Sequence, residues 1–181
     1  KIFVLFTVLV TSFSSIVSIM ARAVEGYFGG WTDLFFQRFM EIWGAIPSLY
    51  IIIIVAAIWR MNFWLLVGLS VMFGWMALVG VVRAEFLRAR NFEYVRAARA
   101  LGVSSPTIIV RHVLPNAMVA TVTMLPFIVT GAIGSLASLD FLGFGLPTSS
   151  PSLGEMTQQA KQNLHAPHLG ITAFMTFSVI L

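Results

Sequence analysis

Two long runs without a charged residue, at residues 61–82 and 116–139, constrain the fold of this chain more than any other feature. At about 1.5 Å per helical residue, each run is long enough to cross a hydrocarbon core of roughly 30 Å. Apolar runs at residues 2–21 and 42–59, and one that starts near Leu169, predict three further helices in the membrane. The sequence therefore predicts an all-α polytopic transmembrane helical bundle with five spans, the last of them incomplete.

The composition agrees with this prediction. Hydrophobic residues make up 59% of the 181 residues and charged residues only 10%, whereas charged residues make up about a quarter of an ordinary soluble domain. The chain has no cysteine, which excludes disulfides, thiolate metal ligands and cysteine nucleophiles. Because the chain starts at Lys1 and ends at Leu181 inside an apolar run, we expect residues 1–181 to be one transmembrane domain that is a fragment of a longer protein.

The segment at residues 83–115, here called the basic loop, carries the net charge of the chain. Six arginines and two glutamates lie between Arg83 and Arg111, which gives +4, and the rest of the chain has five basic and five acidic residues. Short basic loops between membrane spans remain on the cytoplasmic side during insertion. We therefore expect the basic loop to face the cytosol.

Within the basic loop, residues 92–101 are good helix formers. Arg96 and Arg99 share one side of such a helix, and Val95 and Ala98 share another. Gly102 is placed to end this helix. The pattern predicts a short amphipathic helix at the membrane face.

A second short helix is predicted after Gly102. Ser104 or Ser105 can cap it, and Pro106 stands at or next to its first position. We expect Pro115 to stop this helix. The prediction is thus two short helices joined by a glycine turn.

At these residues the chain resembles a family. The run Arg96-Ala97-Ala98-Arg99-Ala100-Leu101-Gly102, nine further residues, and then His112-Val113-Leu114-Pro115 resembles the EAA loop, E-A-A-x3-G-x9-I-x-L-P, of permease subunits of binding-protein-dependent ABC importers, whose fold is the MetI-like type. Arg96 stands in place of the glutamate and His112 in place of the isoleucine. The ensemble is similar to dipeptide and oligopeptide permeases, and NFEYVRAARALGV most resembles permeases that import microcin C and related oligopeptides.

The resemblance implies a transport subunit of the bacterial inner membrane rather than an enzyme. It implies cytoplasmic ATPase subunits that bind ATP and Mg and hydrolyse the ATP, a second homologous permease, a periplasmic substrate-binding protein and a peptide substrate. It also implies that this chain binds no cofactor itself. The residues expected to couple to the ATPase are Glu93, Arg96, Ala97, Ala98, Arg99, Gly102, His112, Leu114 and Pro115.

A second segment with family character, residues 139–168, is here called the second loop. It carries one lysine and no arginine, so we expect it on the periplasmic side. Asp140, Phe141, Leu142, Gly143 and Gly145, followed by Pro147 and by residues 151–155, resemble the S-x-L-x-F-L-G-x-G and P-x-W/L-G segments of peptide-type permeases. Asp140 allows two interpretations. It either contacts a substrate or a proton, or it anchors the loop at the helix end, and the second interpretation is the more economical.

A third, weaker match lies near the first predicted span. Gly26, Gly29 and Gly30 are expected to break the helix there. The resembling family has a Y-x-G-G-x-x-D segment followed by an arginine and an acidic residue, which match Tyr27, Gly29, Gly30, Asp33, Arg38 and Glu41. A salt-bridged helix start explains these charges without any further role.

Other chemistries find little support in the sequence. No G-x4-G-K-S/T run is present, so the chain has no Walker A loop for ATP. His165 and His168 are three apart without a carboxylate motif beside them, so no metal site is predicted. Basic loops also bind nucleic acid or anionic lipid, but membrane topology explains most of this charge and no nucleic-acid partner is predicted. The main alternative function is a secondary transporter or channel driven by an ion gradient, which would carry ionisable residues within its spans.

Overall fold

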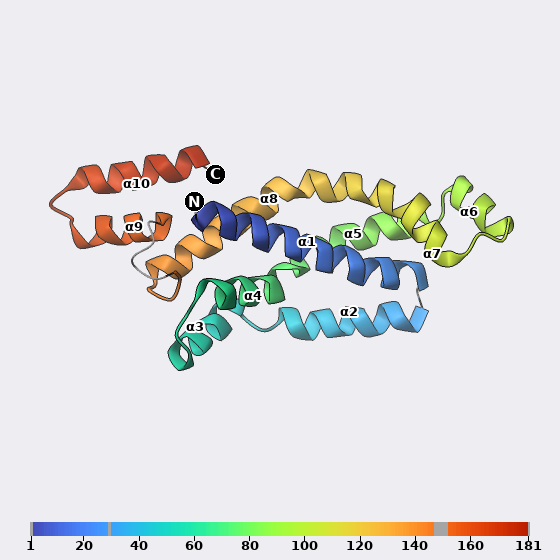
Figure 1. Cartoon of the computed structure of the whole chain (residues 1–181), viewed down its shortest axis with the longest axis horizontal. Coiled ribbons are helices and arrows are strands. Elements are labelled where there is room, and N and C mark those ends of the chain that lie inside the picture. Colours follow the sequence, from blue (N-terminus) through green and yellow to red (C-terminus); the bar gives the residue numbers. More distant parts are fainter. Residues whose placement is uncertain (1, 29, 147–151, 181) are drawn as a thin grey trace. The chain divides into compact units, whose positions relative to one another are not determined.

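The structure, a computed structural model, describes residues 2–28, 30–146 and 152–180, apart from the side chains at 22–24 and 26–28. Every regular element within these ranges is helical (Figure 1). The elements are, in chain order, α1 (Ile2–Phe28), α2 (Gly30–Gly44), α3 (Ser48–Ile58), α4 (Phe63–Gly74), α5 (Met76–Ala89), α6 (Glu93–Ala100), α7 (Ser105–Ile108), a π-helical turn η1 (Ile109–Val113), α8 (Leu114–Phe141), α9 (Leu153–Gln162) and α10 (Pro167–Ile180). The all-α prediction is confirmed.

Three helical stretches in the described part of the chain are long and apolar enough to cross a membrane: Ile2–Ala21, Phe63–Ala89 and Ser105–Phe141. The pair α2 and α3 meets the same criterion together but is bent by 62°, as in a broken span or a re-entrant loop. Pro47 lies at the break between these two helices, as the N-cap residue of α3. Pro47 has no N–H and disfavours a helical residue before it, which accounts for the break.

One predicted break and one predicted helix end differ from the structure, although a break does follow Gly26, since α1 ends at Phe28 and α2 begins at Gly30. Helix α1 continues through Gly26 to Phe28, because a single glycine inside a long apolar helix costs only about 1 kcal/mol. Helix α5 continues seven residues beyond Val82 to Ala89. Arginine, glutamate, alanine and leucine are all strong helix formers, so the change from apolar to charged residues does not end the helix.

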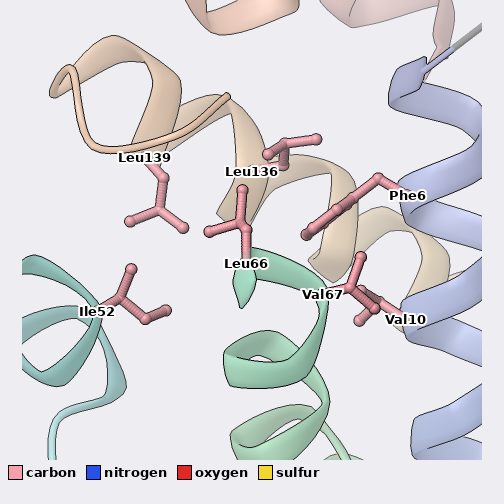
Figure 2. Close-up of a cluster of buried hydrophobic side chains, with 7 residues drawn as sticks. All are labelled: Phe6, Val10, Ile52, Leu66, Val67, Leu136 and Leu139. Carbon is pink, nitrogen blue, oxygen red and sulfur yellow. The ribbon is translucent and has the colours of Figure 1, made fainter. Parts of the chain in front are cut away.

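The chain forms two compact units, each of which draws on separate parts of the sequence. The first comprises Lys1–Thr11, Pro47–Met72 and Phe127–Leu181. Figure 2 shows its core, in which side chains from α1, α3, α4 and α8 converge around Leu66: Phe6, Val10, Ile52, Leu66, Val67, Leu136 and Leu139. The ring of Phe6 meets that of Phe63 edge to face, with the centroids 6.2 Å apart. Apolar helix faces thus supply this core.

Within the first unit, α9 and α10 pack against each other as a hairpin, coloured orange and red in Figure 1. Helix α9 lies inside the second loop, where we had predicted no helix. Its N-cap is Ser152, whose hydroxyl accepts a hydrogen bond from the Glu155 N–H at 3.1 Å. The Ser-x-x-Glu spacing of a capping box was the signal for this helix in the sequence.

The second unit comprises Ser12–Ile46 and Phe73–Pro126. It contains the whole basic loop. The side chains of α5 that face its interior are Leu78, Val79, Val82, Phe86 and Ala89. Val79, Val82, Phe86 and Ala89 are spaced three and four residues apart, with Leu78 beside them, which is the stripe expected of a helix that buries one face.

Candidate functional site

Helix α6 ends in a Schellman motif centred on Gly102. The Val103 N–H donates to the Ala98 carbonyl and the Gly102 N–H donates to the Arg99 carbonyl, both at 3.1 Å. Gly102 has φ of 75°, a left-handed conformation that glycine adopts without a steric penalty. The predicted glycine turn is therefore present, and its hydrogen bonds satisfy the last carbonyls of α6.

The second helix of the basic loop differs from the prediction. Ser104 is its N-cap residue and Pro106 lies within its first two positions. Pro115, however, does not stop the helix: α7 runs through the π-helical turn η1 directly into α8. The Leu114 N–H donates to the Ile109 carbonyl five residues back. A π-turn of this kind accommodates residues that disrupt regular α-helical hydrogen bonding, such as a proline.

A polar contact links the basic loop to the first turn of α8. The side-chain amide of Asn116 donates to the Tyr94 hydroxyl at 2.7 Å and to the His112 carbonyl at 3.0 Å. The rings of Tyr94 and His112 lie with their centroids 6.3 Å apart. These contacts join α6 to the start of α8, 22 residues later. Tyr94 and Asn116 do not stand out as site residues in the sequence, because nothing in their spacing shows that they meet.

The two faces of α6 differ sharply in exposure. Val95 is completely buried and Ala98 is 8% exposed, so the side of the helix that these two residues share is the buried one. Leu101, by contrast, is 83% exposed. The exposed stripe of α6 has the i, i+3, i+4, i+7, i+8 spacing of a single helix face: Glu93, Arg96, Ala97, Ala100 and Leu101.

The structure thus divides the candidate coupling residues. Pro115, Arg99 and Gly102 are exposed together with Glu93, Arg96 and Ala97, whereas His112 and Leu114 are half-buried and Ala98 is buried. The exposed members present two cations, a carboxylate and small apolar side chains. Such a surface is suited to bind a groove of complementary charge on a partner protein.

The charged residues of the third, weaker family match lie in α2 and form two ion pairs. Arg38 and Glu41 pair three residues apart on the solvent-exposed surface of α2. Asp33 instead pairs with Arg83 of α5: the guanidinium Nε and one terminal nitrogen donate to the two carboxylate oxygens at 2.9 and 2.6 Å. The expected salt bridges are therefore present, and one of them joins two helices. Gly29 and the Tyr27 side chain lie outside the described residues.

In the second loop, Gly143 forms a further Schellman motif at the end of α8. The Phe144 N–H donates to the Leu139 carbonyl at 2.9 Å and the Gly143 N–H to the Asp140 carbonyl at 3.0 Å. Gly143 has φ of 81°. Phe144 packs against the core cluster that contains Leu139, the hydrophobic contact that accompanies this motif.

Asp140 organises the turn that follows. It is 6% exposed, and its Oδ1 accepts a hydrogen bond from the Leu146 N–H at 2.7 Å. A Cβ on Gly145 would lie 1.8 Å from that oxygen, and a Cβ on Gly154 would lie 2.4 Å from the Ala137 carbonyl. The structure thus favours Asp140 as a loop anchor and explains both glycines by close approach. Of the candidate residues beside them, Phe141 is half-buried and Leu142 is exposed. Pro147 and Pro151 lie outside the described residues.

Among the residues that the structure describes, no group of three histidine, aspartate or glutamate side chains could hold a metal ion.

Several curated permeases are similar to this chain. The peptidoglycan transport system permease protein YejE of Agrobacterium fabrum is 61% identical over 181 residues, which are 100% of this chain and 48% of that protein. The inner membrane ABC transporter permease protein YejE of Escherichia coli is 58% identical over 181 residues, again 100% of this chain and 53% of that protein. The oligopeptide transport system permease protein OppC of Lactococcus lactis is 38% identical over 152 residues, which are 83% of this chain and 52% of that protein.

The chain spans about half the length of these curated relatives. A family model described as "Binding-protein-dependent transport system inner membrane component" matches residues 14–181. This match covers both the basic loop and the second loop, whose motifs carried the resemblance. The chain belongs to the family of inner membrane components of binding-protein-dependent transport systems.

Proposed function

We propose that this chain forms the membrane-spanning part of a permease subunit in an ATP-driven peptide importer, and that the basic loop couples it to a separate ATPase. The observation that carries the proposal is α6 in its setting: a short helix with one buried face and one exposed face, held at the end of a membrane helix in a chain of this family. ATP and Mg would bind to the partner ATPase.

The geometry of the basic loop supports coupling in physical terms. The buried side chains Val95 and Ala98 fix α6 to its own unit, and the Schellman motif at Gly102 fixes its end. The exposed stripe remains available to a groove of the ATPase. Because one face of α6 is packed firmly, a displacement applied by the ATPase to the exposed face would move the bundle as a rigid body.

The complete importer would contain a second homologous permease and a periplasmic protein that delivers substrate. The translocation path would lie between the two permeases. Closure of the ATPase subunits on ATP would move the two basic loops together, and the bundles would turn from inward-facing to outward-facing. This scheme follows the family assignment and the names of the relatives, two of which are permeases for peptidoglycan and oligopeptides.

A site-specific crosslink tests the coupling role. Residues 1–181 contain no cysteine, so a cysteine introduced here is the only one in this segment. Ala97 is exposed on α6, whereas its neighbour Ala98 is buried, which makes Ala97→Cys the probe and Ala98→Cys the matched control. In the assembled importer, with cysteines scanned over the ATPase, we expect crosslinks from position 97 whose yield changes with ATP.

Uptake into proteoliposomes tests the substrate and the energy source. We expect ATP-dependent uptake of short oligopeptides, with peptidoglycan-derived peptides and microcin C-like peptides as further candidates. The alternative is a secondary transporter. If uptake survived ATP depletion but stopped when the ion gradient was collapsed, and position 97 crosslinked to no ATPase, the alternative would replace our proposal.

A further inference from the structure

One ion pair lies at the base of the basic loop and joins segments that are 50 residues apart. The guanidinium of Arg83 on α5 binds both carboxylate oxygens of Asp33 on α2, at 2.9 and 2.6 Å. The side chains of Arg83 and Asp33 are only 30% and 14% exposed. A two-point contact of this kind fixes orientation as well as distance, so it resists rotation and sliding of α5 against α2.

Arg83 stands close to the coupling helix along the chain. It lies six residues before the end of α5 at Ala89, roughly 9 Å along the helix axis, and α6 starts at Glu93. The connection between them is short and hydrogen-bonded: the Arg90 N–H donates to the Phe86 carbonyl and the Phe92 N–H to the Ala89 carbonyl, both at 3.1 Å. Phe86 and Ala89 are buried. A displacement of α6 therefore reaches Arg83 through a stiff segment.

A second carboxylate belongs to this cluster. Glu25 of α1 is completely buried and lies within electrostatic range of Arg83. Arg83 is thus bonded to a carboxylate of α2 and interacts electrostatically with a carboxylate of α1. Partial removal of charged side chains from water costs free energy unless the charges are paired. If these residues only filled space between the helices, apolar side chains would pack equally well. The presence of these charges calls for a role that depends on charge or on orientation.

We propose that Arg83 and Asp33 are positioning residues that fasten α5 to α2, so that a movement of the basic loop is transmitted to the N-terminal helices instead of being lost in bending of α5. The proposal rests on the coupling function proposed above for the basic loop. Glu25 strengthens the fastening from α1. Loss of the ion pair between Asp33 and Arg83 should reduce transport while ATP hydrolysis continues. If the ion pair served folding alone, its loss would lower transport and ATP hydrolysis together.

The test compares peptide imported per ATP hydrolysed in the assembled importer in proteoliposomes. In Asp33→Asn and Arg83→Gln variants, we expect this ratio to fall about tenfold or more, with ATPase activity and the crosslink from position 97 retained. Arg83→Lys keeps the charge but gives up the two-point contact, so we expect an intermediate loss. The matched control is Arg38→Gln with Glu41→Gln, which removes the exposed pair on the same helix and should leave the ratio unchanged.

A charge exchange provides rescue. Asp33→Arg with Arg83→Asp restores the pair but places a second carboxylate near Glu25, so Glu25→Gln is added to relieve the repulsion. We expect this triple variant to recover most of the ratio. An unchanged ratio in Asp33→Asn and Arg83→Gln would overturn the proposal, and so would a parallel loss of membrane level, crosslink and ATPase activity that the triple variant does not recover. Failure of the native importer to use ATP at all would instead refute the coupling function itself.

Discussion

A substitution at Gly102 tests the effect of backbone conformation without any side-chain clash. Gly102 has φ of 75°, and a Cβ built there would meet nothing within 4 Å. Gly102→Ala therefore introduces no clash, and its whole effect is the strain of a left-handed conformation in a residue with a Cβ. That strain is about 1–2 kcal/mol, which corresponds to roughly a 5–30-fold shift in the equilibrium between the native turn and opened states.

Hydrogen exchange of the basic loop measures this shift directly. The protected N–H groups at the turn are those of Leu101, Gly102 and Val103, which donate to carbonyls of α6. When opening is fast, their exchange rate follows the population of the opened state. We therefore expect these amides to exchange roughly 5–30-fold faster in Gly102→Ala, by the strain given above. Under the proposed coupling function the import rate should fall as well, since a loop that opens more often would transmit less of the movement of the ATPase.

Gly68→Ala is the matched control. Gly68 lies in α4, its φ is not positive, and a Cβ there also meets nothing within 4 Å. Alanine favours a helix by up to about 1 kcal/mol over glycine, so exchange in the basic loop should remain at the native rate. Exchange in Gly102→Ala within twofold of native would refute the reasoning, because it would mean that the left-handed turn is not what closes α6.

Three further perturbations follow from the contacts. Gly154→Ala forces its Cβ against the Ala137 carbonyl at 2.4 Å, so α8 and α9 must separate, and we expect a lower unfolding temperature in detergent by an overpacking cost of about 1–3 kcal/mol; an unchanged temperature would contradict the close packing. Asp140→Ala removes the acceptor of the Leu146 N–H, at a cost of about 1–3 kcal/mol, whereas Asp140→Asn keeps a carbonyl oxygen and should remain stable and active; a stable Asn variant that fails to import would show that the charge itself is used. Tyr94→Phe and Asn116→Ala should each loosen α6, and a double-mutant cycle on its hydrogen exchange should give a coupling of roughly 0.5–1 kcal/mol, while additive effects would mean that the two side chains do not interact.

Local features of the fold were predictable from the sequence. The length of the uncharged runs required helices in the membrane, because no other single-chain element satisfies its backbone hydrogen bonds there without closing a barrel. The glycine turn at 102 was predictable because a helical run ended at the residue type that favours the left-handed conformation. The helical period placed Val95 and Ala98 on one side of α6, but it did not show that this side is buried, as the structure has it.

What the sequence did not show depends on distant residues or on competition between local signals. The pairing of Asp33 with Arg83, and of Tyr94 with Asn116, requires the tertiary arrangement. Pro115 was expected to end a helix, but the π-turn before it absorbs the disruption. The arrangement around Asp140 was only partly visible, since the glycines of the second loop gave no sign of which atoms approach them.

The two loops use glycine for different physical reasons, and this difference is itself open to test. At Gly102 the requirement is conformational, with open space around the Cβ position, so the penalty should depend little on side-chain size and alanine and leucine should be about equally harmful. Asparagine, which tolerates the left-handed region, should be milder than either. At Gly154 the requirement is space, so the penalty should rise steeply from alanine to leucine. The first pattern leaves the surface of the basic loop free to fit a partner while its backbone stays fixed, as the proposed coupling role requires. A steep size dependence at Gly102 in the assembled importer would place the ATPase directly against this turn.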